Sequence, residues 1–263
     1  DLAFFDAVVK TIPPAEVSAA LKDAFEGSGP LISMSSPTDL VGGQGAIQTA
    51  YNTAHAKDVT APAALATVTW PYTDFGPPGK VADQREIADL DTVFVRFENG
   101  VRLTIKPTKF RDDQVLVKVR VGSGLRGLPP SRQSLAWAGY AFIEGGLKKI
   151  SANDAERVLA STVYGADYRI EDDANVLTGA TRRGDVDTQM QVLAAYVSEP
   201  GWRPEALQRM KTYTATLLDQ YGATDSGVLG RDLPGLMHAG DRRWTFPSRD
   251  DIGAADLEAL KTQ

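Results

Sequence analysis

The sequence predicts an α+β fold: a mostly antiparallel sheet with helices packed on one face. Two observations lead to this prediction. Apolar and polar residues alternate between Asp91 and Gly124 as they do in β-strands. From Thr92 onward, segments typical of strands and helices follow in the order strands, helices, strands, helices. Strands grouped in this way usually pair with their neighbours, so we expect residues 91–263 to form one sheet with its helices on a single side.

The clearest strand signal is a hairpin at Asn99-Gly100. Apolar residues at 94–97 precede this pair, and alternating apolar residues at 101–105 follow it. Asn-Gly between two such runs is the strongest short-range hairpin signal, because both residues accept a positive φ. A further alternating run of valines at 115–121 extends the prediction to a β-meander.

The rest of this region predicts helices around one strand pair. Ser151 and Asp154 form a capping-box pattern, Asp185 stands where it can cap the next helix, and Pro204 stands where a long helix begins. We predict helices at 131–144, after 151, after 185, from 204, at 226–238 and from 248, and two strands separated by a turn near 172–175.

The first ninety residues predict a different organisation. Residues 1–60 contain helical patterns and one short apolar run at 30–35, "PLISMS", which predicts a buried strand. This is a partial α/β segment with too few strands to cover its own helices. Residues 61–90 are rich in Pro and Gly and predict an extended linker, anchored by Trp70, Tyr72 and Phe75.

Composition excludes several classes of function. The net charge of −6 argues against a general nucleic-acid partner, and no apolar run is long enough to insert into a membrane. The absence of cysteine excludes disulfides, thiol nucleophiles and cysteine-based zinc sites. Hydrophobic residues make up 43% of the chain, which is enough for a sizeable core.

Local motifs predict no active site. Gly122, Gly124 and Gly127 spell a dinucleotide-binding pattern, but Pro129-Pro130 follow at once and no βαβ unit surrounds them. His55 and His238 are the only histidines, and neither has another histidine one helical turn away. Catalytic zinc needs about three converging ligands, so we predict no metal site from the residues themselves.

Several elements of this region follow one another in a recognisable order: the Asn-Gly hairpin, Gly165-Ala166 before a strand, the strand pair, the helix ending at Glu199-Pro200 and the long helix from Pro204. This ordered set resembles one half of a pitrilysin/insulinase-type (inverzincin) zinc metallopeptidase. The resemblance covers about residues 90–262. The long linker and the following Phe-x-Asn-Gly-Val pattern are most like the bacterial, PqqL-like branch of the family.

This resemblance implies a place in a longer protein. Members of the family consist of two homologous halves, each of two α+β domains of the LuxS/metallohydrolase-like type, joined by a linker. Residues 1–60 would be the C-terminal tail of a domain of the first half, residues 61–90 the linker, and residues 91–263 the first domain of the second half.

The resemblance also implies that this chain is not itself an enzyme. Active halves carry His-x-x-Glu-His on the helix after the meander, where two histidines bind zinc and the glutamate is the general base. The matching positions here read "AWAGY", with Ala136, Gly139 and Tyr140 at the three functional places. It therefore implies no catalytic residue and no cofactor in this chain, and zinc only in a catalytic half.

Three functions stay open at this point. The first is the non-catalytic, chamber-forming part of a zinc metallopeptidase, with the missing catalytic half and a peptide substrate as partners. The second is a catalytically inactive homologue that serves as a structural or peptide-binding subunit. The third is a free-standing α+β binding module whose similarity is only architectural. The family resemblance alone favours the bacterial periplasm or export.

One segment is a candidate for peptide binding. In catalytic halves, a peptide adds as a strand to the sheet edge that lies after the zinc helices. The matching segment here is "ADYRI", which comprises Ala166, Asp167, Tyr168, Arg169 and Ile170. An edge strand offers unpaired backbone groups to an extended peptide. The alternative is an ordinary edge protected by its charged side chains.

Overall fold

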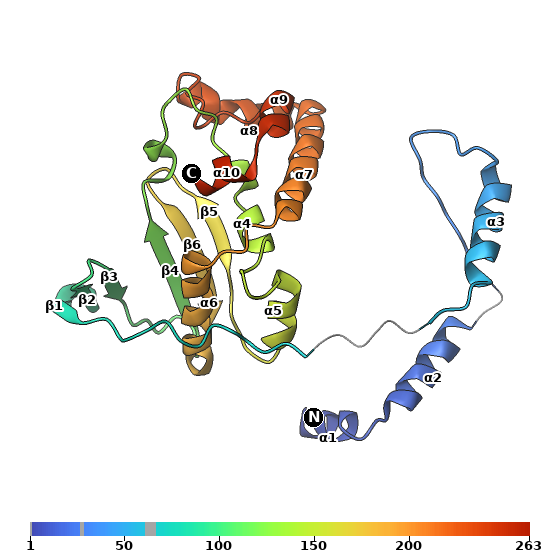
Figure 1. Cartoon of the computed structure of the whole chain (residues 1–263), viewed down its shortest axis with the longest axis horizontal. Coiled ribbons are helices and arrows are strands. Elements are labelled where there is room, and N and C mark those ends of the chain that lie inside the picture. The colour runs from blue at the N-terminus through green and yellow to red at the C-terminus, as the bar shows by residue number, and fades with distance from the viewer. Residues whose placement is uncertain (1, 27–28, 61–66) are drawn as a thin grey trace. The chain divides into compact units, whose positions relative to one another are not determined.

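The computed structural model describes residues 2–26, 29–60 and 67–263 (Figure 1). The chain divides into two compact units, Asp1–Leu65 and Ala66–Gln263. This division precedes most of the predicted linker, because the segment after residue 66 belongs to the second unit.

The first unit consists of helices without a core of their own. Its helices are α1 (Leu2–Val9), α2 (Pro14–Phe25) and α3 (Gly43–His55), as the sequence predicts. Residues 30–35 form no strand, so the predicted buried strand is wrong, and the Leu31 side chain is fully exposed. Among the residues of this unit whose exposure the structure describes, which leave out residues 2 and 6, none is buried. Helices that bury no apolar face are marginal in water when they stand alone.

The predicted hairpin is present in the second unit. It joins β2 (Thr92–Phe97) to β3 (Arg102–Ile105). The Phe97 N–H donates to the Val101 carbonyl at 2.9 Å, and Gly100, with φ of 88°, donates to the Phe97 carbonyl at 3.0 Å. Only Gly100 needs the left-handed region, so the connection is a three-residue loop ending in a glycine bulge.

A third strand precedes this hairpin. β1 (Val81–Ile87) pairs antiparallel with β2 and gives the sheet order β1-β2-β3. It lies in the range predicted as linker, so that prediction is wrong for residues 81–87. Trp70 and Tyr72 do anchor the preceding segment: the Trp70 indole N–H donates to the Tyr72 carbonyl and to Gln191, and Tyr72 is buried. Phe75 is exposed and anchors nothing.

The remaining strands form a separate sheet. β6 (Asn175–Thr181) lies between β4 (Val115–Val121) and β5 (Asp167–Ile170), and both pairings are antiparallel. The expectation of a single sheet is therefore wrong, since the strands divide into two sheets of three. The cause is that β4 finds its partner in β6, across seven matched positions, and not in β3.

The α+β prediction itself is confirmed. α4 (Ala141–Glu144), α5 (Ala152–Val158) and α6 (Val186–Ser198) pack on one face of the second sheet, and α6 lies across its strands in Figure 1. Sheet residues Val117, Val119 and Leu177 meet helix residues of this core, while Leu116 on the opposite face is exposed.

The C-terminal helices are α7 (Pro204–Gly222), α8 (Asp225–Met237), α9 (Arg249–Ala254) and α10 (Leu257–Lys261). Ala255 and residues of α7 and α10 form a second core with residues of the segment 135–141; its buried members are Leu135, Ala138, Ala141, Ala206, Leu207, Met210, Ala255 and Leu260. Short 3-10 turns occupy Ala88–Leu90 (η1), Gly124–Gly127 (η2), Ala136–Ala138 (η3) and Arg183–Asp185 (η4).

Within the described residues, no helix has both the length and the apolar character needed to cross a bilayer.

The helix caps follow the sequence with one exception. Ser151 caps α5 through the Asp154 N–H, and Ser248 forms a complete capping box with Asp251. Asp185 does not cap α6: its carboxylate accepts the Val163 N–H at 2.8 Å and pairs with Arg182. The hydrogen bonds from Val163 and Arg182 lower the pKa of Asp185.

Candidate functional site

The motif-matching residues do not form the predicted helix. Residues 131–144 contain only the turn η3 and the four-residue α4, with Gly139 between them. Tertiary bonds replace helical ones at the start of this segment, because the Gln263 side chain accepts the Leu135 N–H at 2.7 Å and donates to Ser134. Glycine adds a helix penalty of about 1 kcal/mol. A Cβ at Gly139 would make an ordinary contact with the Tyr168 ring of β5 at 3.6 Å, and its tightest neighbour would be the Ala136 carbonyl oxygen at 3.2 Å.

The surroundings of these positions are apolar. Ala138 is fully buried in the second core, where it packs with Ala206, Leu207 and Met210 of α7. Neither Ala136 nor Gly139 offers a side-chain ligand, and the part of α7 that packs beside them presents apolar residues. The residues present therefore do not fit a catalytic zinc ion. In the described part of the chain, no three His, Asp or Glu residues cluster closely enough to hold a metal.

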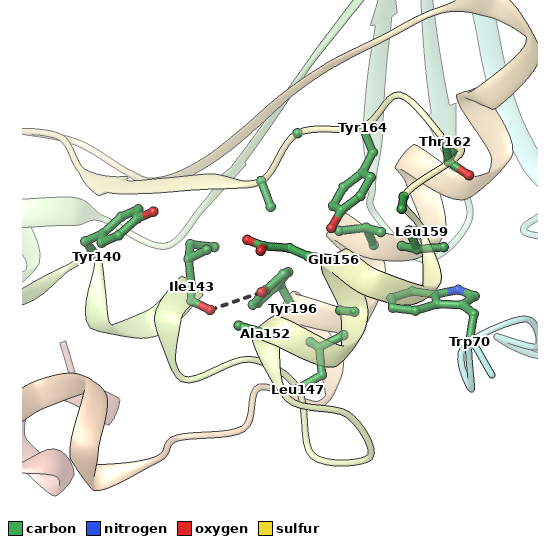
Figure 2. A pocket seen from close by; sticks show the side chains of 15 residues that line it. Trp70, Tyr140, Ile143, Leu147, Ala152, Glu156, Leu159, Thr162, Tyr164 and Tyr196 are labelled. Carbon is green, nitrogen blue, oxygen red and sulfur yellow. Dashed lines mark hydrogen bonds between the residues drawn. The ribbon is translucent and has the colours of Figure 1, made fainter. Parts of the chain in front are cut away.

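Tyr140 behaves differently from its neighbours. We expect from the sequence that aromatic residues fill the space beside Ala136 and Tyr140. Tyr140 is instead half exposed and lines a pocket of about 360 Å³ (Figure 2). Ala136 does not line it. The expectation is thus wrong at Tyr140, because a tyrosine here is held at the rim of a cavity bounded by α4, α5 and α6.

The candidate edge strand has an open side. β5 is the last strand in the order β4-β6-β5, and among the described strands it pairs with β6 alone. At the hairpin end, the Glu171 N–H donates to the Ala174 carbonyl at 2.8 Å. Backbone groups alternate in direction along an antiparallel strand. Those of Arg169 and Asp167 therefore face β6, and those of Tyr168 and Ile170 face the open side.

The side chains of β5 alternate between the core and solvent. The Tyr168 ring packs on Phe142 at 4.5 Å between centroids, and burial raises the pKa of its hydroxyl to about 12. Ile170 is buried. Asp167 and Arg169 are exposed on the other face and form an ion pair at 3.3 Å. The edge thus exposes its backbone while its side chains are held in place.

A buried glutamine fixes Gly165, which lies two residues before β5. The fully buried Gln189 of α6 accepts the Gly165 N–H and donates to the Gly165 carbonyl, both at 2.8 Å. A Cβ at Gly179 of β6 would lie 2.3 Å from the Gln189 amide nitrogen and the Gly165 carbonyl oxygen, so only glycine fits there. Sequence analysis identified Gly165-Ala166 but missed Gln189. A polar residue on an amphipathic helix carries no local sign that it is buried.

Paired charges surround the β5–β6 turn. Glu171 accepts hydrogen bonds from Lys118 at 3.1 Å and Arg120 at 2.7 Å, and Arg120 also binds Asp173 at 2.6 Å. The hydrogen bonds from Lys118 and Arg120 lower the pKa of Glu171. The carboxylates of Glu171 and Asp173 are thus paired with basic side chains of β4, so they are poor candidates for a cation site.

The comparisons with known proteins give the fold a context. The periplasmic protease PqqL from Escherichia coli aligns with a TM-score of 0.64 and 14% identity, over 83% of this chain and 24% of its own. FusC, a ferredoxin protease solved with Arabidopsis ferredoxin, aligns at 0.59 and 14% identity, over 86% of this chain and 25% of its own. A peptidase M16 inactive domain from Pseudomonas fluorescens aligns at 0.54 and 11% identity, over 66% of this chain and 42% of its own.

The chain has the fold of M16 peptidase domains. At these identities the likeness concerns the fold alone, and the chain spans about a quarter of the length of the PqqL and FusC chains. No protein-family model matches the sequence, and neither does any curated protein.

Proposed function

We propose that this chain is the non-catalytic, chamber-forming part of a zinc-dependent M16 metallopeptidase that degrades peptides. The observation that carries the proposal is the combination of an M16 fold with Ala136, Gly139 and Tyr140 at the motif positions. Zinc and the general base would then belong to a separate catalytic half, which is the proposed partner of this chain.

The two units support this assignment in different ways. The helices α1–α3 bury no described residue, which fits an origin as the tail of a preceding domain whose sheet would cover them. The second unit includes residues 67–80 and also β1, which pairs with β2. We therefore place the boundary between the two units near residue 66, earlier than the sequence predicts. The first domain of the second half would then begin near residue 66 and not at residue 91, and it would include β1.

We further propose that β5 holds substrate by strand addition. Its outward-facing backbone groups at Tyr168 and Ile170 have no strand partner in the described part of the chain. An extended peptide satisfies such groups whatever its sequence, which suits a chamber that degrades varied peptides. The exposed pair of Asp167 and Arg169 lies on a face of the sheet and leaves the backbone edge open.

The second candidate is an inactive homologue with no active half. The M16 inactive domain from Pseudomonas fluorescens favours it, since that protein shares this fold. The complete open reading frame separates the two: a His-x-x-Glu-His motif upstream of residue 1 supports the peptidase, and its absence supports the homologue. Because PqqL is a periplasmic protease, we propose export for this protein, which fractionation of the source cells tests.

We expect the purified chain to bind no stoichiometric zinc and to cleave no peptide. The reason is that the motif positions offer no imidazole or carboxylate. Metal analysis after zinc loading and an assay on a quenched fluorescent peptide measure this. Equimolar zinc that survives dialysis, or cleavage that a chelator abolishes, would contradict the proposal.

Tyr168→Pro is expected to weaken peptide capture by about tenfold or more. Proline removes the outward N–H of Tyr168, which is not used in pairing with β6, and its ring obstructs an added strand. Tyr168→Ala is the matched control, since it also loses the ring but keeps the N–H. Fluorescence anisotropy of an unstructured peptide on the full chain measures both. Equal affinities for the two variants would remove β5 as the binding edge.

A further inference from the structure

A pocket lies beside the start of β5 and contains one carboxylate among aromatic rings. It measures about 360 Å³, within the usual range for small-ligand sites. Figure 2 shows the Glu156 carboxylate of α5 pointing into the pocket between Tyr140 and Tyr164. Trp70 and Tyr196 complete its aromatic lining.

Glu156 is the source of charge in this pocket. In the part of the chain that the structure describes, its carboxylate accepts no hydrogen bond and joins no ion pair. Burial, and secondarily the Glu156 charge, raise the pKa of Tyr164, while burial is the main cause that raises the pKa of Tyr196. The phenols of Tyr164 and Tyr196 are therefore neutral at neutral pH, and the described residues that line the cavity include no Lys or Arg. The pocket carries one unneutralised negative charge.

The aromatic lining favours a delocalised cation. The faces of tyrosine and tryptophan attract guanidinium groups, which also stack on them. Two of the polar atoms are already engaged: the Tyr196 hydroxyl donates to the Ile143 carbonyl at 3.1 Å, and the Trp70 N–H donates to Gln191 at 3.0 Å. Among the described lining residues, the Glu156 carboxylate is the one charged acceptor, and it matches the donor-only guanidinium.

The pocket adjoins the candidate peptide edge. Gly165 and Ala166, which lead into β5, form part of its wall. A strand added to β5 lies about 4.8 Å from it, so side chains near that end of the peptide come within reach of the opening. The same wall is fixed by Gln189 through its two bonds to Gly165.

We propose that this pocket binds the side chain of an arginine in a peptide that pairs with β5, with Glu156 as the residue that determines the preference. The proposal rests on the proposed function, because it takes β5 as the edge that holds the peptide. Such a pocket gives the chamber a preference for arginine at one position of the peptide. The backbone contact with β5 accepts any sequence.

The test compares two short fluorescent peptides that differ only in a central arginine or its neutral isostere citrulline. On the full chain we expect the arginine peptide to bind about fivefold more tightly, the size of a partly exposed ion pair, and the difference to shrink with added salt. Glu156→Gln, which keeps the shape, should abolish the difference. Glu205→Gln, an exposed acid on α7, should preserve it. Equal binding of both peptides to the unmodified chain, or a preference that survives Glu156→Gln, overturns the proposal.

A third probe separates this proposal from the one on β5. N-acetyl-arginine amide is too short to add as a strand, so its binding reports on the pocket alone. If it binds in a Glu156-dependent way while neither peptide binds, the pocket is supported and the β5 edge is not. If both peptides bind equally and lose affinity with Tyr168→Pro, the β5 edge is supported and the arginine pocket is rejected.

Discussion

Replacing Gln189 with alanine is expected to destabilise the second unit by about 2–3 kcal/mol, because the N–H and the carbonyl of Gly165 both lose their partner. For a unit of this size the midpoint of thermal unfolding should fall by about 4–10 °C. Thermal and urea unfolding followed by circular dichroism measure the change.

Gln191 provides the matched control for this substitution. It is the same residue type on the same helix, and it accepts one hydrogen bond, from the Trp70 indole, which retains the Tyr72 carbonyl as a second acceptor. Gln191→Ala should therefore cost less than about 1 kcal/mol. Similar losses for the two variants would show that Gln189 does not hold the start of β5 in the way its contacts indicate.

Gly124→Ala is expected to have the largest effect, about 2–5 kcal/mol. Its φ of 55° costs about 1–2 kcal/mol for a residue with a Cβ, and overpacking adds about 1–3 kcal/mol. The added Cβ would lie 2.1 Å from the Glu171 carbonyl oxygen and 2.5 Å from the Ala174 nitrogen, both of which belong to the β5–β6 turn. Urea unfolding of the full chain measures the loss.

Gly122 in the same loop separates the two causes. It has a similar φ of 70°, but a Cβ there would meet only the Asn175 side chain, at 3.3 Å. Gly122→Ala should therefore cost only the backbone term of about 1–2 kcal/mol. If Gly124→Ala lowers the free energy of unfolding no more than Gly122→Ala does, the close contact between this loop and the β5–β6 turn is not rigid.

These glycines explain what the dinucleotide-like pattern at 122–127 does. The pattern ends β4 and brings the loop against the β5–β6 turn, where the Leu125 N–H donates to the Glu171 carbonyl at 3.0 Å. Sequence analysis interprets this segment as a loop leaving a strand. Its contact with residues some fifty positions later depends on the pairing of β4 with β6, which no local pattern reveals.

Local signals predict local structure well in this chain. The Asn99-Gly100 hairpin, the Ser248 cap and the helix that begins at Pro204 each depend on residues a few positions apart. The prediction of a single sheet was wrong because the pairing of strands depends on which side chains become buried across the whole domain. β4 pairs with β6 because this places Val117 and Val119 beside Leu177 against the helices.

The candidate site shows the same limit. The resemblance identified β5 and the motif positions, but the pocket beside them joins Trp70, Tyr140, Glu156 and Tyr164 from four separate segments. These four residues form no motif of fixed spacing in the sequence that would indicate a shared pocket. Helix formation at 131–144 was also overestimated, because bonds from the distant Gln263 compete with helical ones at Ser134 and Leu135.

The most direct test of peptide capture by this fold is amide hydrogen exchange, resolved by residue with NMR, on the full chain with and without an unstructured peptide. Strand addition to β5 predicts new protection at the amides of Tyr168 and Ile170, which face the open side, with little change at Arg169, whose amide faces β6. Protection that leaves Tyr168 and Ile170 unchanged, or that appears only outside β5, would contradict the account.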